Sequence, residues 1–185
     1  MSVVARFNQL FKTMSRGCLI SLLSLLVCNT VNAENSLSKQ DKLKAAYLFN
    51  FTKFIEWPNL GDSKLPAPIR ICLDGSSEFF EFFEFLEQLV ANRRVGKLKQ
   101  PLAILPLETA SGCELLFVRV GGKQITRQSD HTIIVADSTD IFFPGVAMVF
   151  YIKKNKLRFE IDLKKIKSLN VAVSSELLKL ASIKQ

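Results

Sequence analysis

The chain has 185 residues, 48% of them apolar, with a formal net charge of +8. This length suits one domain with its own core, and no internal repeat or low-complexity tail is visible. A single histidine and the absence of a CxxC pair argue against a zinc site. The chain also lacks the GxSxG, GxxxxGK[ST] and GxGxxG motifs of common hydrolases and nucleotide-binding proteins.

Residues 1–33 have the pattern of a secretory signal peptide. Basic residues without any acidic residue precede an apolar run from Cys18 to Val27. This run is shorter than the roughly 20 residues that span a bilayer, and Val31-Asn32-Ala33 provides small residues for cleavage. We expect cleavage after Ala33 and an exported domain of residues 34–185. A retained anchor and lipidation at Cys28 are the alternatives.

Cleavage would leave two cysteines, Cys72 and Cys113. In an exported chain this pair favours a disulfide over a metal site or a reactive thiol. The signal peptide also carries three basic residues and no acidic ones, so the remaining domain is only mildly basic. For an exported protein of this charge, an anionic membrane surface or an acidic protein is a better partner than nucleic acid.

The first half of the domain alternates helices and strands. Apolar residues at helical spacing predict a helix from Ser38 to Trp57, which Pro58 ends. A strand at Ile69–Leu73 precedes a second helix, Ser77–Ala91, with Ser76 or Ser77 as its N-cap. Further elements are expected at Val95–Lys99, Ala103–Leu107, Glu114–Val118 and Thr132–Ala136, which are short strands, and at Lys123–Ser129, a weak helix.

The second half predicts a β-hairpin followed by short helices. Val146–Ile152 is apolar on both faces, as a central strand is, whereas Leu157–Leu163 alternates apolar and polar residues. A short helix ends near Asn170, and Ser174 or Ser175 caps the last helix. The fold class is therefore α/β: a single layered domain whose mixed β-sheet is flanked by helices, with a C-terminal β-hairpin and helix.

Few residues suggest chemistry. His131 is alone before an apolar strand, where a structural or surface role is a better interpretation than catalysis. The glutamates of the second helix recur at every third residue, a spacing typical of a solvated face rather than of a calcium loop. The basic stretches at 93–99 and 153–167 are solvated surface, or contacts to anionic headgroups or an acidic partner. We expect no catalytic residue, metal or cofactor.

The segment Lys44–Pro58, KAAYLFNFTKFIEWP, resembles the opening helix of the YfiR family of small periplasmic proteins. Further stretches are similar to that family: IRICLDG at 69–75, CELLFV at 113–118, LRFEIDL at 157–163 and LNVAVSSELLKLA at 169–181. Glu114 stands where the family usually has a histidine, and Asp162 replaces an asparagine. The places that carry the opening signature are Lys44, Tyr47, Leu48, Phe51, Phe54, Trp57 and Pro58. We expect the aromatic members and Pro58 to belong to the core.

This resemblance implies a periplasmic protein that inhibits an inner-membrane diguanylate cyclase by binding its sensor domain. It also implies a Cys72–Cys113 disulfide, a homodimer and an outer-membrane lipoprotein as a second partner. The hairpin and the segment after it are the expected partner-binding region, with Arg158, Phe159, Glu160 and Leu169 as candidates. Phe159 points inward by its pattern, so Arg158 and Glu160 are the better surface residues. A ligand-sensing or docking module for another receptor, such as a histidine kinase, and a periplasmic enzyme are the alternatives.

Overall fold

The computed structural model describes residues 37–60, 66–74, 79–109, 112–119, 130–141 and 145–185. The predicted signal peptide, residues 1–33, lies outside these residues, as do the weak helix expected at 123–129 and the serines 76 and 77. From Leu37 onward the described residues belong to one folded unit.

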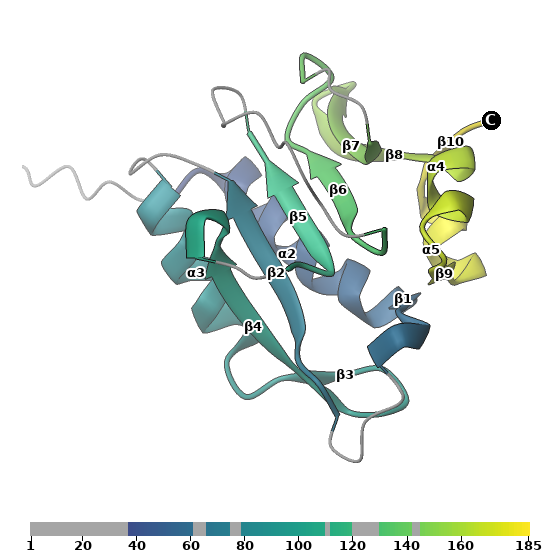
Figure 1. The fold of residues 1–185 in the computed structure, drawn as a ribbon. Coiled ribbons are helices and arrows are strands. Elements are labelled where there is room, and N and C mark those ends of the chain that lie inside the picture. The colour runs from purple at the N-terminus through teal and green to yellow at the C-terminus, as the bar shows by residue number, and fades with distance from the viewer. Residues whose placement is uncertain (1–36, 61–65, 75–78, 110–111, 120–129, 142–144) are drawn as a thin grey trace, which may run out of the picture. The chain divides into compact units, whose positions relative to one another are not determined.

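The described strands form two sheets. The larger sheet contains β2 (Ile69–Asp74), β3 (Arg94–Val95), β4 (Gln100–Pro106), β5 (Leu115–Val118), β6 (Ile133–Ala136), β7 (Val146–Lys153), β8 (Lys156–Asp162) and β10 (Ser182–Lys184). Their spatial order is β10-β8-β7-β6-β5-β2-β4-β3. In this order, neighbouring strands from β7 through β6, β5 and β2 to β4 are parallel. β8 is antiparallel to β7, and β3 is antiparallel to β4 (Figure 1). This arrangement confirms the mixed sheet of an α/β domain.

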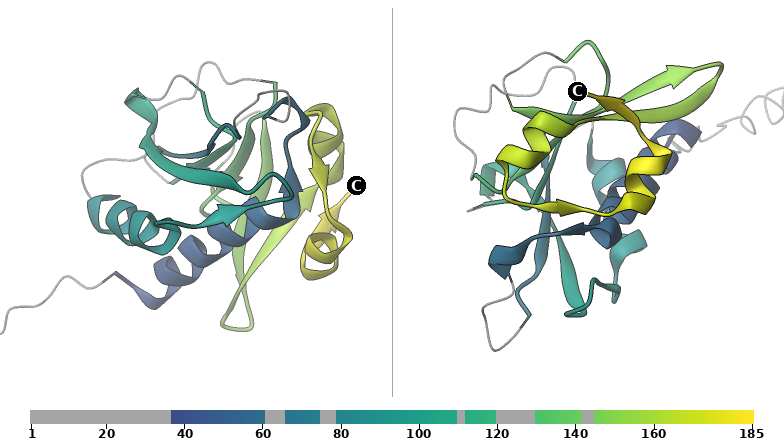
Figure 2. Two further views of the ribbon diagram at one scale, coloured as in Figure 1. Left: turned by 90° about the horizontal axis from the view of Figure 1, so that it is seen from below. Right: turned by 90° about the vertical axis from the view of Figure 1, so that its right-hand side faces the viewer.

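Two longer and two shorter helices accompany the larger sheet in the described residues. They are α2 (Lys39–Phe54), α3 (Phe80–Val90), α4 (Leu163–Ser168) and α5 (Ser175–Leu180), with 3-10 turns η1 (Pro58–Leu60) and η3 (Leu107–Thr109). α2 and α3 lie side by side against the sheet, and the C-terminal elements lie together beside the β7–β8 hairpin (Figure 2).

The predicted aromatic helix is α2, and its sequence explains both of its ends. At the start, Ser38 accepts a hydrogen bond from the backbone N–H of Asp41 at 3.0 Å, as an N-cap does. At the end, the prediction was three residues too long. Ile55 and Glu56 form β1, which pairs with β9 (Ala172–Val173) in the small second sheet. This distant pairing overrides the helical pattern that the residues continue.

The core lies between α2 and the sheet. Phe51 and Phe159 are buried with their ring centroids 5.0 Å apart, and Tyr47 covers Phe159 at 5.4 Å. Rings in such edge-on and tilted contacts stabilise beyond the area that they bury. The structure therefore confirms that the aromatic helix is a core element. Pro58 is exposed in η1 and lies outside that core.

The strand predicted at Val95–Lys99 is wrong. β3 ends at Val95, and residues 96–99 turn back into β4. Gly96 and Lys99 have φ values of 70° and 50°, the left-handed region that a strand never uses. β4 accordingly begins at Gln100, three residues before the predicted start. A single glycine in an otherwise extended pattern was the signal for this turn.

Of the predicted N-caps, only that of α5 lies within the described residues. α3 begins at Phe80 after Phe79, which makes no side-chain cap hydrogen bond, and the predicted serine caps lie outside the described residues. For α5 the cap is confirmed, because Ser174 accepts from the backbone N–H of Leu177 at 3.3 Å. β10 was not predicted, since its three residues are all exposed and show no apolar alternation.

Candidate functional site

The predicted partner-binding residues of β8 separate onto two faces. Phe159 is 2% exposed and packs among the aromatic rings beneath α2. Arg158 is exposed and Glu160 is half-buried on the opposite face, where they lie across from Tyr151 and Val149 of β7. Of this trio, only Arg158 and Glu160 are therefore accessible to a partner.

A cavity of about 520 Å³ opens beside Glu160. Its wall combines apolar side chains with both signs of charge: Ile141, Val146, Met148, Glu160, Lys165 and Lys184. Edge strand β10 supports this region, since Lys184 lies 3.9 Å from Asp162 and the Tyr151 hydroxyl lies 2.5 Å from that of Ser182. Glu160 thus lines a cavity whose wall includes residues of both β8 and the edge strand β10.

Leu169 has a different setting from Glu160. It is half-buried against the main core, and its carbonyl lies 3.2 Å from Nδ1 of His131. The carbonyl of His131 in turn accepts from the indole N–H of Trp57 at 3.2 Å. These contacts tie the segment after α4 to the end of the aromatic helix, and they give His131 the structural role expected for it.

Cys72 and Cys113 form the expected disulfide. Both lie in a second buried apolar cluster with Leu116, Val118 and Ile134. The bond joins β2 to the residues just before β5, its parallel neighbour. It therefore fastens the centre of the sheet.

A buried ion pair reinforces the same place. Glu114, 3% exposed, accepts from the backbone N–H of Arg70 at 2.7 Å and from its guanidinium at 2.7 and 3.0 Å. These hydrogen bonds raise the pKa of the Arg70 guanidinium above its usual value, and the charge of Glu114 adds to the shift against partial burial. The pair and the disulfide together hold β2 against the start of β5.

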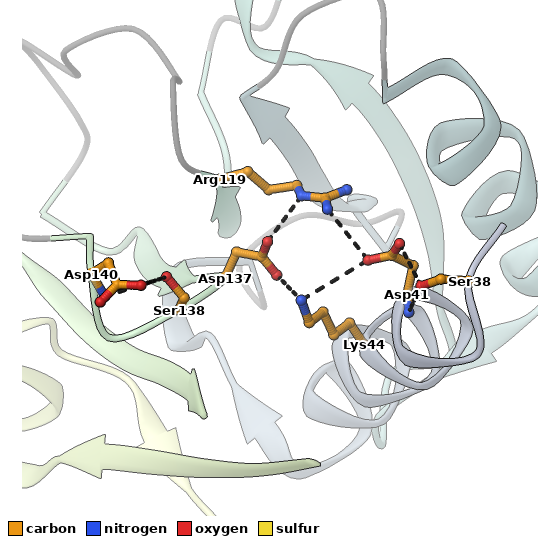
Figure 3. Close-up of polar contacts among 7 residues, drawn as sticks. All are labelled: Ser38, Asp41, Lys44, Arg119, Asp137, Ser138 and Asp140. Carbon is orange, nitrogen blue, oxygen red and sulfur yellow. Dashed lines mark hydrogen bonds and ion pairs between the residues drawn. The ribbon is translucent and has the colours of Figure 1, made fainter. Parts of the chain in front are cut away.

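A second ion cluster lies at the carboxyl ends of β5 and β6, the sheet edge where ligands of many α/β proteins bind. Figure 3 shows Lys44 of α2 between Asp41 and Asp137, with Arg119 reaching both carboxylates. Arg119 donates to Asp137 at 2.9 Å and lies 4.5 Å from the ring centroid of Phe79. Every charge of this cluster is paired, so it ties α2 to the sheet and provides no free base or nucleophile.

Sequence reasoning missed this cluster. Lys44 was noted only as part of the opening signature, although a lysine in the middle of an apolar helix needs a buried partner. Asp137 follows directly after the buried strand β6, which was the second available signal. Neither position alone indicates the other, because the two lie 93 positions apart in the chain, with several strands between them.

A protein-family model with the description YfiR/HmsC-like matches residues 41–182. The chain belongs to the YfiR/HmsC-like family. This confirms the resemblance carried by the opening signature. No curated protein matches the chain.

YfiR/HmsC-like proteins are periplasmic regulators rather than enzymes. In the described ranges, no three His, Cys, Asp or Glu side chains gather as a metal site would require. None of the described helices is both long and apolar enough to cross a membrane. In this family member the histidine expected at position 114 is a glutamate, whose carboxylate is committed to Arg70.

Proposed function

We propose that this protein inhibits an inner-membrane diguanylate cyclase by binding the cyclase's periplasmic sensor domain. The observation that carries the proposal is the YfiR/HmsC-like match over residues 41–182. The expected result of binding is less cyclic-di-GMP and less biofilm. An outer-membrane lipoprotein that sequesters the inhibitor, and a homodimer as its active form, belong to the same proposal.

The accessible residues of β8 support a binding role. Arg158 and Glu160 point away from the core on a strand whose buried residue Phe159 fixes their direction. The outer edge of β8 is covered by β10 only from Glu160 to Asp162, so its first half is open to a partner within the described structure. Charges at such a surface set the orientation and the association rate of a complex.

The mechanism is a shift of the cyclase between two states. An inhibitor changes that equilibrium only by binding the inactive state more tightly. Moving it from 99:1 active to 1:99 needs roughly 5.5 kcal/mol of differential affinity. One interface with a few buried anchors can supply a difference of this size, so no catalysis is required of the inhibitor.

The test is the cellular level of cyclic-di-GMP after deletion of the gene and after its restoration. We expect a rise on deletion and a return when the wild-type chain is exported again. Restoration with a chain that carries Glu160→Lys should leave the level high. An unchanged level on deletion would contradict the proposal.

A second candidate is a ligand-sensing module for another receptor, such as a histidine kinase. The observation that favours it is the cavity beside Glu160, which joins an apolar floor to charges of both signs. Pockets of this size and mixed lining bind small molecules. A thermal-shift screen with small amphipathic zwitterions tests this candidate, and a strong rise in melting temperature for one compound, lost in Glu160→Lys, would support it.

A further inference from the structure

The turn of the β7–β8 hairpin carries a cationic cluster that does not include the partner-binding candidates Arg158 and Glu160. We call Ile152, Lys153, Lys154 and Lys156 the tip cluster. Lys153 lies directly opposite Lys156 in the strand register. Like charges in direct cross-strand pairs destabilise a hairpin, so this pair opposes the fold of the element that contains it.

The turn residue Lys154 adds a second unfavourable feature. Lys154 and Asn155 have φ values of 50° and 57°, so both central residues of the two-residue turn are left-handed. Asparagine followed by glycine fills such a turn at least cost, and a lysine there is strained. Strain at one residue, next to a repulsive pair, suggests that the charge serves another purpose.

The lysines of the tip cluster also make no ion pair with any residue that the structure describes. All three are exposed, and no carboxylate of the described residues lies in ion-pair range of them. By contrast, the exposed Lys97 pairs with Glu56 and Lys184 with Asp162. Ile152, on the other face of the hairpin, is 49% exposed. The tip therefore presents concentrated positive charge beside one apolar side chain.

Both views in Figure 2 show the hairpin turn extending beyond the neighbouring strands. A projecting tip contacts a flat surface first. Protein interfaces are built around buried aromatic or arginine anchors and are poor in lysine, whereas flexible lysines beside an aliphatic residue suit phosphate headgroups at a membrane interface. We propose that the tip cluster docks on an anionic phospholipid surface, with its lysines at the headgroup phosphates and Ile152 at the interface.

This proposal does not rest on cyclase inhibition, because the tip cluster excludes Arg158 and Glu160. The first test is co-sedimentation of the exported chain with vesicles of equal parts phosphatidylglycerol and phosphatidylcholine. We expect binding to these vesicles, none to pure phosphatidylcholine, and loss of binding between about 0.1 and 1 M salt, where the screening length falls from roughly 10 to 3 Å.

Matched variants identify the residues. Lys153→Gln with Lys156→Gln should weaken vesicle binding about 25-fold, at roughly fivefold per charge. The control is Lys164→Gln with Lys167→Gln, which removes the same charge from exposed positions on α4 and should leave binding within about twofold. Equal losses from both double variants would mean that net charge alone acts, and would overturn the proposal.

Lys154→Asn separates charge from turn stability. It should raise the urea midpoint of unfolding, because asparagine tolerates the left-handed conformation, and yet weaken vesicle binding about fivefold. Ile152→Ser should weaken vesicle binding at low salt without changing how steeply binding falls as salt is raised. Undiminished vesicle binding by Lys154→Asn would overturn the proposal. Binding of the exported chain to polyglutamate without any binding to vesicles would also overturn it, and would point to an acidic protein as the partner instead.

Discussion

Glu114 accepts three hydrogen bonds from one residue, Arg70: one from its backbone N–H and two from its guanidinium. Both the backbone and the side chain of this β2 residue are therefore joined to the start of β5. The carboxylate is buried and the guanidinium lies near the surface. Because a buried charge is costly once its partner is lost, this pair is a point where a small substitution has a large effect.

Glu114→Gln should lower the free energy of unfolding by about 2–3 kcal/mol, since the amide cannot accept all three bonds and places its own N–H groups against donors. Urea unfolding with the disulfide intact measures the loss. The matched control is Glu87→Gln on the exposed side of α3, which should stay within about 0.5 kcal/mol. Equal midpoints for the two variants would contradict the role given to the pair.

Reduction of Cys72–Cys113 should cost about 3–4 kcal/mol, because the bond closes a loop between residues 41 positions apart. The chain should stay folded when reduced, as Arg70 and Glu114 hold the same two strands. Urea unfolding with and without reductant tests this, and thiol titration confirms the redox state.

The disulfide and the ion pair should also be coupled. Removing both, by Glu114→Gln under reducing conditions, should cost more than the sum of the separate losses, since each device limits the movement that the loss of the other permits. Strict additivity would show that they act independently.

Lys44→Met should lower the free energy of unfolding by about 2 kcal/mol. Methionine keeps an unbranched side chain that suits the helix, but it removes the charge. Asp137, which is largely buried at the sheet edge, then has Arg119 as its remaining cationic partner. Lys42→Met is the control, because Lys42 is exposed on the same helix. Thermal and urea unfolding of both variants should show a shift only for Lys44→Met; a shift of the same size in both would argue for a general effect of charge.

Glu160→Lys should leave the fold within about 1 kcal/mol of wild type, yet weaken binding to a cyclase sensor domain at least about tenfold, as charge reversal at an interface does. Calorimetric titration with the purified sensor domain measures this. Phe159→Leu is the complementary variant: it should destabilise the core by about 1–3 kcal/mol while the folded protein keeps its affinity. Unchanged affinity in Glu160→Lys would remove this surface from the proposal.

Several features followed from the chain alone. The helix α2, the buried face of β8 and the disulfide could be predicted from local periodicity or from the expected compartment, which need no knowledge of distant residues. Local patterns gave wrong or missing predictions where strand pairing depended on a segment far away in the sequence. Ile55 continues the helical pattern but pairs with Val173, and β10 has no pattern of its own beyond its contact with β8.

The sequence by itself determined that this is a mixed α/β domain of the YfiR/HmsC-like family and which face of the hairpin is buried, because side-chain periodicity records burial directly. Only the tertiary structure decided that Lys44 meets Asp137, that Arg70 holds Glu114 and that the tip lysines have no described acidic neighbour. Strand order and parallel crossovers bring such groups together over long separations, and no local pattern encodes that order.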